Sequence, residues 1–259
     1  MRGGGLPLTA MNVLLRLAGR LALMLGLLVP IAQIRAQEQP TRLNVWDIHI
    51  GETAAEIPDG FINYACGTDG GPPSIPLKNF TEFKKCRSDA NGLHEVYFEY
   101  DDELEYWARA LELEAEIRRY AGTTAYEFPV VASLLFDDAG VAKGERLVTD
   151  PRQQVLARDR REFWVLAEFI RHRFGDDGWQ CKEVPPDEGE HAVGSLFIKN
   201  DCVKKANGLR LVLEQRYFRK KGQQAVDPET GQSRPEDYES ATRFEMYDAG
   251  LPLRKTSVK

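Results

Sequence analysis

Apolar residues recur every three or four positions in two segments of the chain, which predicts two helices. The first helix begins after the acidic pair Asp101-Asp102 and ends before Gly122, and the second runs from Pro151 to about Arg173. Acidic residues at a helix start and a glycine after its end are typical of helix boundaries. The apolar positions are Leu104, Trp107, Ala108, Leu111 and Ala115 in the first helix, and Leu156, Phe163, Leu166, Phe169 and Ile170 in the second.

Shorter segments combine β-branched and aromatic residues with an alternation of apolar and polar positions, which predicts strands. These segments are 95–100, 130–136, 144–148, 195–199, 209–217, 239–247 and 251–258. Residues 43–50 alternate in the same way and predict an edge strand. Because tight-turn sequences such as Asn91-Gly92 precede several of these segments, we expect antiparallel hairpins. Antiparallel strands with separate helices place the chain in the α+β class.

Two stretches of the chain carry the same landmarks in the same order, which indicates an internal duplication. The tetrapeptide Ala-Asn-Gly-Leu occurs at 90–93 and at 206–209, each time at the same distance behind a cysteine. Each copy continues with a predicted strand and later with Asp-Ala-Gly, at 138–140 and 248–250. We therefore predict an α+β fold of two repeated, disulfide-tied antiparallel β-meander modules with two helices, one of which links the modules.

The predicted organisation has five parts. They are a signal peptide at 1–36, an extended lead-in at 37–56, module 1 at 57–151, the linking helix at 152–174 and module 2 at 175–259. The sequence leaves open whether the two meanders form one sheet or two packed units.

The first 36 residues have the pattern of a cleavable export signal. They contain four arginines and no acidic residue, and their apolar run from Leu21 to Ala32 is interrupted by Pro30. This run is shorter than the roughly 20 apolar residues that span a bilayer. The small residue Ala36 precedes a polar stretch, as at a cleavage site. We expect a periplasmic or secreted protein with no stable membrane span after cleavage; the alternative is an uncleaved membrane anchor.

All four cysteines follow the predicted signal, as expected for two disulfides in an exported protein. The repeat favours pairing within each copy, between Cys66 and Cys86 and between Cys181 and Cys202. A four-thiolate zinc site is the alternative, but structural zinc ligands usually come in pairs about two to four residues apart. The cysteines of each pair are 20 and 21 residues apart, which favours disulfides.

The charge of the chain limits the classes of partner. The chain has 34 basic and 40 acidic residues, and removal of 1–36 takes away four arginines, so the formal net charge of the mature protein is −10. Such an acidic protein is poorly suited to nucleic acid or to anionic membranes. One local basic cluster remains, and we predict it as an interaction patch for an acidic glycan or for the acidic face of an envelope protein. Its residues are Arg216, Arg219, Lys220 and Lys221, and the alternative is a solvated hairpin end.

The sequence contains no motif for a catalytic, cofactor-binding or metal-binding site, and none is predicted. Asp47 and His49 share one face of the predicted edge strand, but a metal site needs three or four ligands. The acidic residues at 101–105 are explained by a helix start, where they cap the backbone and complement the helix dipole.

These observations favour an exported, non-catalytic binding or assembly component of the cell envelope. One alternative is an exported hydrolase whose carboxylates converge only in the folded chain. The other is a glycan-binding protein that uses aromatic side chains as platforms. Trp107 and Trp164 fall on or beside the apolar helix faces and are assigned to the core, which leaves Trp46 and Trp179 for such a platform.

Overall fold

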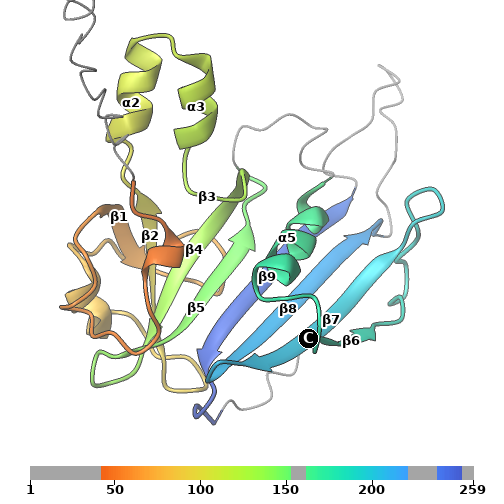
Figure 1. Ribbon diagram of the computed structural model, residues 1–259. Coiled ribbons are helices and arrows are strands. Elements are labelled where there is room, and N and C mark those ends of the chain that lie inside the picture. The colour runs from red at the N-terminus through yellow and green to blue at the C-terminus, as the bar shows by residue number, and fades with distance from the viewer. Residues whose placement is uncertain (1–41, 153–161, 221–237, 253–259) are drawn as a thin grey trace, which may run out of the picture. The chain divides into compact units, whose positions relative to one another are not determined.

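The fold is built on a mostly antiparallel sheet, shown in Figure 1. The computed structural model describes residues 42–152, 162–220 and 238–252. Within these residues, the sheet has nine strands in the order β1-β2-β4-β5-β9-β8-β7-β6, with β3 paired to β4 alone. Its strands are β1 (Phe61–Cys66), β2 (His94–Tyr100), β3 (Thr124–Ala125), β4 (Phe128–Phe136), β5 (Ala142–Thr149), β6 (Gln180–Glu183), β7 (Ile198–Ala206), β8 (Leu209–Phe218) and β9 (Glu239–Asp248).

Strands from both predicted modules share this one sheet. The junction is the antiparallel pair β5–β9, in which Gly144 lies opposite Tyr247 and Arg146 opposite Glu245. The two meanders are therefore not separate packed sheets. β9 lies between β5 and β8, so the last described strand occupies the middle of the sheet.

The helices are short. They are the 3-10 helices η1 (Val45–Asp47), η2 (Phe80–Lys85) and η3 (Phe163–Val165), and the α-helices α2 (Glu103–Ala110), α3 (Glu114–Tyr120) and α5 (Leu166–Arg173). The second predicted helix is found only in part, because residues 153–161 lie outside the described residues.

The first predicted helix is two helices, so the prediction of one continuous helix was wrong. The chain turns between α2 and α3 at Glu112, whose φ of 55° is left-handed and incompatible with a right-handed helix. α2 and α3 consequently pack against each other as an antiparallel pair beyond the ends of β2 and β4 (Figure 1). We call α2, α3 and their connection the hairpin.

The predicted edge strand at 43–50 was also wrong. The side chain of Asn44 accepts a hydrogen bond from the backbone N–H of Trp46, and the carboxylate of Asp47 accepts one from the backbone N–H of Asn44. This reciprocal capping holds the turn η1 and overrides the alternating pattern. The predicted strand at 195–199 begins only at Ile198, and Leu251 and Pro252 are not in a strand; residues 253–259 lie outside the described part.

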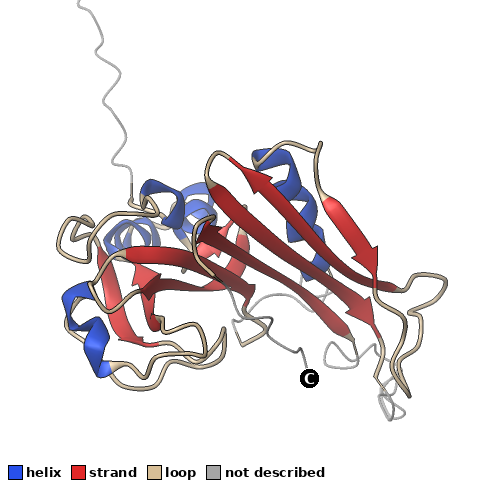
Figure 2. Ribbon diagram, turned by 90° about the horizontal axis from the view of Figure 1, so that it is seen from below, coloured by secondary structure: helices blue, strands red, loops and turns tan. Residues whose placement is uncertain are grey.

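The sheet has a core face and an outer face. Val96, Phe98 and Leu134 point to the core face, where Leu166, Ala167 and Ile170 cover the side of β8 and β9. Figure 2 shows α5 on that side of the strands. Because successive side chains of a strand alternate, Tyr97 of β2 and Arg146 of β5 point to the opposite, outer face.

Two disulfides tie the chain, and they join the cysteines as the repeat predicts. Cys66, at the end of β1, is bonded to Cys86 behind η2, and Cys181 is bonded to Cys202, which lies directly opposite it in the pair β6–β7. Within the residues that the structure describes, no helix is both long and apolar enough to cross a membrane.

Candidate functional site

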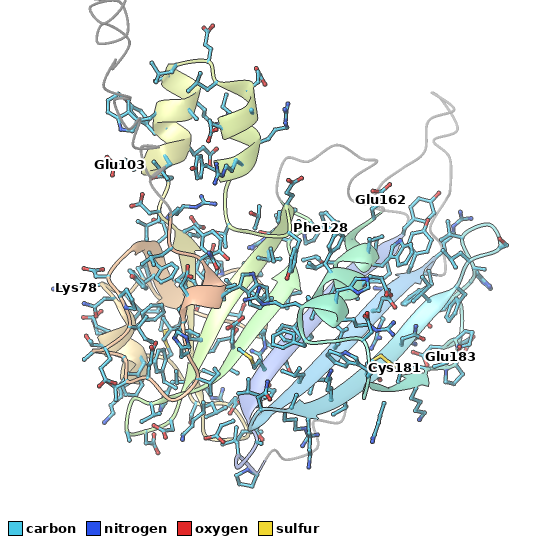
Figure 3. The ribbon with its side chains drawn as sticks, viewed as in Figure 1. Lys78, Glu103, Phe128, Glu162, Cys181 and Glu183 are labelled. Atoms are coloured by element: carbon cyan, nitrogen blue, oxygen red, sulfur yellow. A yellow bond between two sulfur atoms is a disulfide. The ribbon has the colours of Figure 1, made fainter. Side chains whose placement is uncertain are left out.

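A cleft of about 920 Å³ lies between the hairpin and the outer face of the sheet. A neighbouring hollow of about 210 Å³ shares Tyr97, Glu99 and Glu105 with it. Figure 3 labels Glu103, the first residue of the hairpin, and Phe128, the first residue of β4. The charged side chains that line this hairpin cleft come from β2, α2, α3, the turn before β4 and the end of β5, and they are Glu99, Glu105, Arg109, Arg118, Glu127, Asp150 and Arg152.

Glu105 and Arg109 fix the α2 wall of the cleft. The Nε and Nη2 atoms of Arg109 donate to the same oxygen of Glu105, at 2.9 and 2.7 Å. The other oxygen of Glu105 accepts the backbone N–H of Gly122 at 2.7 Å. One carboxylate therefore orients the guanidinium and also ties the start of the hairpin to its end.

Asp150 and Arg152 form a second fixed pair on the opposite wall. The guanidinium donates from Nε and Nη2 to the two oxygens of Asp150, at 2.8 and 2.9 Å, in the bidentate geometry that suits this pair. Asp150 is buried and its backbone N–H binds the carbonyl of Pro129, so it is anchored to the β4–β5 pair. Arg152 is half-exposed and keeps part of its guanidinium toward the cleft.

Tyr97 and Glu99 form the floor. The hydroxyl of Tyr97 donates to one oxygen of Glu99, and the amide nitrogen of Asn63 donates to the other at 2.7 Å. Asn63 has a left-handed φ of 54° at the irregularity where β1 slips its register against β2. Burial, and then the bonded carboxylate, raise the pKa of Tyr97, so its hydroxyl stays protonated and donating at neutral pH.

The hairpin also carries exposed apolar side chains that do not line the cleft. Tyr106, Trp107, Leu111 and Leu113 are 66, 53, 63 and 46% exposed. The rings of Tyr106 and Trp107 meet edge to face at 5.6 Å, and Leu111 lies one helical turn after Trp107. We call these four residues the hairpin patch. The assignment of Trp107 to the core was therefore wrong. Its helix, α2, packs against α3 and not against the sheet, so the Trp107 side chain remains exposed.

A buried ion network lies further along the outer face. Arg146 donates to Glu95 and to Glu245, each at 2.7 Å, and its Nη1 lies 3.2 Å from a carboxylate oxygen of Asp69. Arg243 pairs with the same Asp69 and Glu245. Burial raises the pKa of Glu245, but the charges of Arg146 and Arg243 outweigh it and lower this pKa below its ordinary value.

Glu145 is a buried carboxyl of another kind. It lies on the core face, is fully buried, and neither of its oxygens has a hydrogen-bond partner among the described residues. Burial raises its pKa to about 8, and the charge of Arg173 in α5 counteracts that rise only in part. Glu145 is therefore a neutral acid at neutral pH.

The comparisons with family models, curated proteins and solved structures gave no match.

The two carboxyl groups whose pKa is raised, those of Glu145 and Glu214, do not lie together in one cleft. Burial raises the pKa of Glu145 and of Glu214, but they lie on opposite faces, because Glu145 is opposite Met246 and Glu214 is opposite Arg243. Neither lines the hairpin cleft. In the described part of the chain, no group of three or more His, Cys, Asp or Glu side chains is placed to hold a metal ion. Asp47 caps η1 instead, and His49 binds Glu52.

Two of the four residues in the predicted basic patch, Arg216 and Lys220, are paired with acidic side chains. Arg216 donates to Asp201 at 2.6 Å and to Glu214 at 3.2 Å, and Lys220 pairs with Glu239. The guanidinium of Arg219 lies over the ring of Tyr238, 5.4 Å from its centroid. Lys221 lies outside the described residues. The cluster thus presents less positive charge than the sequence indicates.

The predicted aromatic platform is packed against protein. Trp46 and Trp179 are half-buried against the core, and Arg173 lies 4.3 Å from the ring centroid of Trp46. The indole N–H of Trp179 donates to the carbonyl of Gly175. The ring centroids of Trp164 and Tyr217 are 5.8 Å apart.

The sequence did not indicate the hairpin cleft. Glu99, Arg118 and Arg152 are far apart in sequence, and only the fold brings them to the lining of one cleft.

Proposed function

We propose that this protein is an exported, non-catalytic binding component of the cell envelope, and that it binds a partner protein through the hairpin patch. The observation that carries this proposal is the exposure of Tyr106, Trp107, Leu111 and Leu113. Contiguous exposed apolar side chains are uncommon on monomeric proteins and mark interaction sites. Trp and Tyr are also the residues that most often dominate binding energy.

Export is supported by two features of the chain. Residues 1–36 have the composition of a signal peptide, although they lie outside the described residues. Both disulfides are of the kind that persists in oxidising compartments such as the periplasm or the extracellular space.

The proposal includes a duplication of one module. It is supported by the strand neighbours, since β2 pairs with β4 and, in the second half, β8 pairs with β9. A disulfide lies before the first strand of each pair, and Asp-Ala-Gly follows the second. The copies differ in detail: in the second half the strand pair β6–β7 carries the disulfide, whereas in the first half Cys86 follows the helix η2.

The charge of the hairpin defines the chemistry of the partner. Residues 103–120 contain five glutamates and three arginines, a net charge of −2. An acidic, apolar surface is complementary to a protein groove that is apolar at its centre and bordered by lysine or arginine. The same acidic charge opposes binding to an anionic bilayer.

Photocrosslinking in the host tests this proposal. A photoreactive phenylalanine analogue is placed at Trp107, and a matched control is placed at Ile75, which is 54% exposed but lies in the loop behind β1. We expect a crosslink to one envelope protein at position 107 and none at position 75. The affinity of that purified protein is then measured for the wild type and for Leu111→Ser, which we expect to bind about tenfold or more weakly.

Equal crosslinking at both positions, or an affinity that Leu111→Ser leaves unchanged, would contradict the proposal. Crosslinks to lipid alone would assign the patch to a membrane surface. Because the four side chains are exposed, their substitution should leave the folded state intact, and thermal unfolding of each variant checks this.

A further inference from the structure

The walls of the hairpin cleft are made of hydrogen-bonding groups that are already held in place. Arg109 and Arg152 each use Nε and Nη2 to bind a carboxylate of the same wall. A guanidinium has five N–H donors, so each arginine retains donors after this pairing. Their positions are fixed before any ligand arrives, which lowers the entropy lost on binding.

Acceptors are fixed in the same way. Glu99 is held by the hydroxyl of Tyr97 and by the amide of Asn63, one on each oxygen. A carboxylate has about four lone-pair sites, so it can accept further hydrogen bonds. The cleft therefore has oriented acceptors on its floor and oriented donors on its walls.

The charge of the lining selects against strongly ionic ligands. Four acidic and three basic residues line the cleft, a sum of −1. Glu105 is paired with Arg109, and Asp150 with Arg152, while the exposed Arg118 and Glu127 make no hydrogen bond or ion pair with another described residue. An isolated anion would lie near a carboxylate and an isolated cation near a guanidinium, so either ion would meet a like charge. An uncharged ligand rich in donors and acceptors would not.

We propose that the hairpin cleft is a binding site for an uncharged oligosaccharide. Neighbouring hydroxyls of a sugar both donate and accept, and planar carboxylate and guanidinium groups can bind two such hydroxyls at once. The volume of about 920 Å³ is at the upper end of the about 300–1,000 Å³ that is usual for small-molecule sites. The site is separate from the hairpin patch, so it does not depend on the proposed protein partner.

A glycan array with the purified, disulfide-bonded protein tests this inference. The array carries neutral, sulfated and uronic-acid oligosaccharides. We expect binding to one or more neutral glycans, and we expect Glu99→Gln and Arg118→Ser each to weaken it by about tenfold or more, since each removes a hydrogen-bonding charged group. Arg119→Ser is the matched control, because Arg119 is adjacent in α3 but does not line the cleft.

A second control separates this site from the protein-binding surface. Leu111→Ser, which alters the hairpin patch, should leave glycan binding unchanged. The inference is overturned if no neutral glycan binds, if only sulfated or uronic-acid glycans bind, or if Glu99→Gln and Arg118→Ser bind as the wild type does. Arg118 is exposed and has no ion pair with another described residue, so Arg118→Ser should leave the fold intact, and thermal unfolding of the variant checks this.

Discussion

Glu145 and Arg146 are neighbours in β5, yet their side chains lie on opposite faces of the sheet in opposite surroundings. Arg146 is bound by three carboxylates on the outer face, those of Glu95, Glu245 and Asp69. Glu145 is buried on the core face, where no described group donates a hydrogen bond to it. Adjacent residues thus give one fully paired ion and one carboxyl that burial holds in its neutral form.

Substitution of Glu145 should change how stability depends on pH. Its pKa of about 8 in the folded state is above the ordinary value of 4.5, so the folded protein binds this proton more tightly than the unfolded chain. The proton therefore stabilises the fold fully below pH 4.5, and this stabilisation is lost as the pH rises to about 8. We expect Glu145→Gln to be more stable than the wild type by about 3 kcal/mol at pH 7.

Urea unfolding at several pH values between 5 and 8 measures this effect. The difference in unfolding free energy between Glu145→Gln and the wild type should grow by about 1.4 kcal/mol per pH unit. Glu183→Gln, at an exposed strand position, is the control and should show no such trend. A difference that stays constant with pH would contradict a neutral buried acid.

Replacement of Arg146 by methionine should destabilise the protein strongly. The variant would leave the buried Glu95 and the partly buried Glu245 with less positive charge to offset them, and breaking a buried pair in this way costs about 3–5 kcal/mol. The double variant Arg146→Met/Glu245→Gln should recover part of that loss, because one buried charge is removed with its partner. Additive losses in chemical denaturation would show that the two residues are not coupled.

The two disulfides should contribute unequally. Each closes a loop of similar length, 20 and 21 residues, so the entropic contribution is about 3 kcal/mol for both. Cys66 and Cys86 are both buried in the core, whereas Cys181 is exposed. We expect the double alanine variant at 66 and 86 to have the lower melting temperature. If the double variant at 181 and 202 melts as the wild type does, its disulfide does not stabilise the fold.

The connection of the hairpin contains a strained residue that glycine should relieve. Glu112 is left-handed, which costs a non-glycine residue about 1–2 kcal/mol. Glu112→Gly should therefore slow amide hydrogen exchange in α2 and α3, while Glu112→Ala, which keeps the Cβ, should not. Exchange is the better measure because it reports the local stability of the hairpin separately from that of the sheet. Faster exchange in Glu112→Gly would contradict the strain argument.

The sequence predicted those features that depend on nearby residues. Alternation at 209–217 and 239–247 corresponds to β8 and β9, because one face of each strand is buried against α5. The pattern at 43–50 gave the wrong element because a capping box formed by Asn44 and Asp47 outweighed it. The break between α2 and α3 at Glu112 could not be predicted, because no glycine or proline occurs there in the sequence.

The candidate site could not be predicted in the same way. Arg152 and Glu99 line the same cleft because β4 lies between β2 and β5 in the sheet order, and the sequence alone does not fix that order. The arginines at 216 and 219 formed the more visible cluster in sequence, yet Arg216 is taken up by Asp201 and Glu214 across the strands. Clusters that are local in sequence were easier to find than this cleft, whose residues meet only through the fold.

The central place of β9 has a consequence for the order of folding. Among the described residues, β9 is the only strand that joins β5 to β8, and it is also the last strand that the structure describes. When the chain is synthesised or transported from its N-terminus, β5 and β8 become available before β9. Each then has one unpaired edge until residues 239–248 follow. Contacts of such long sequence separation form slowly, and open strand edges invite aggregation. We expect the nascent chain to need protection by a chaperone until its final strand is available.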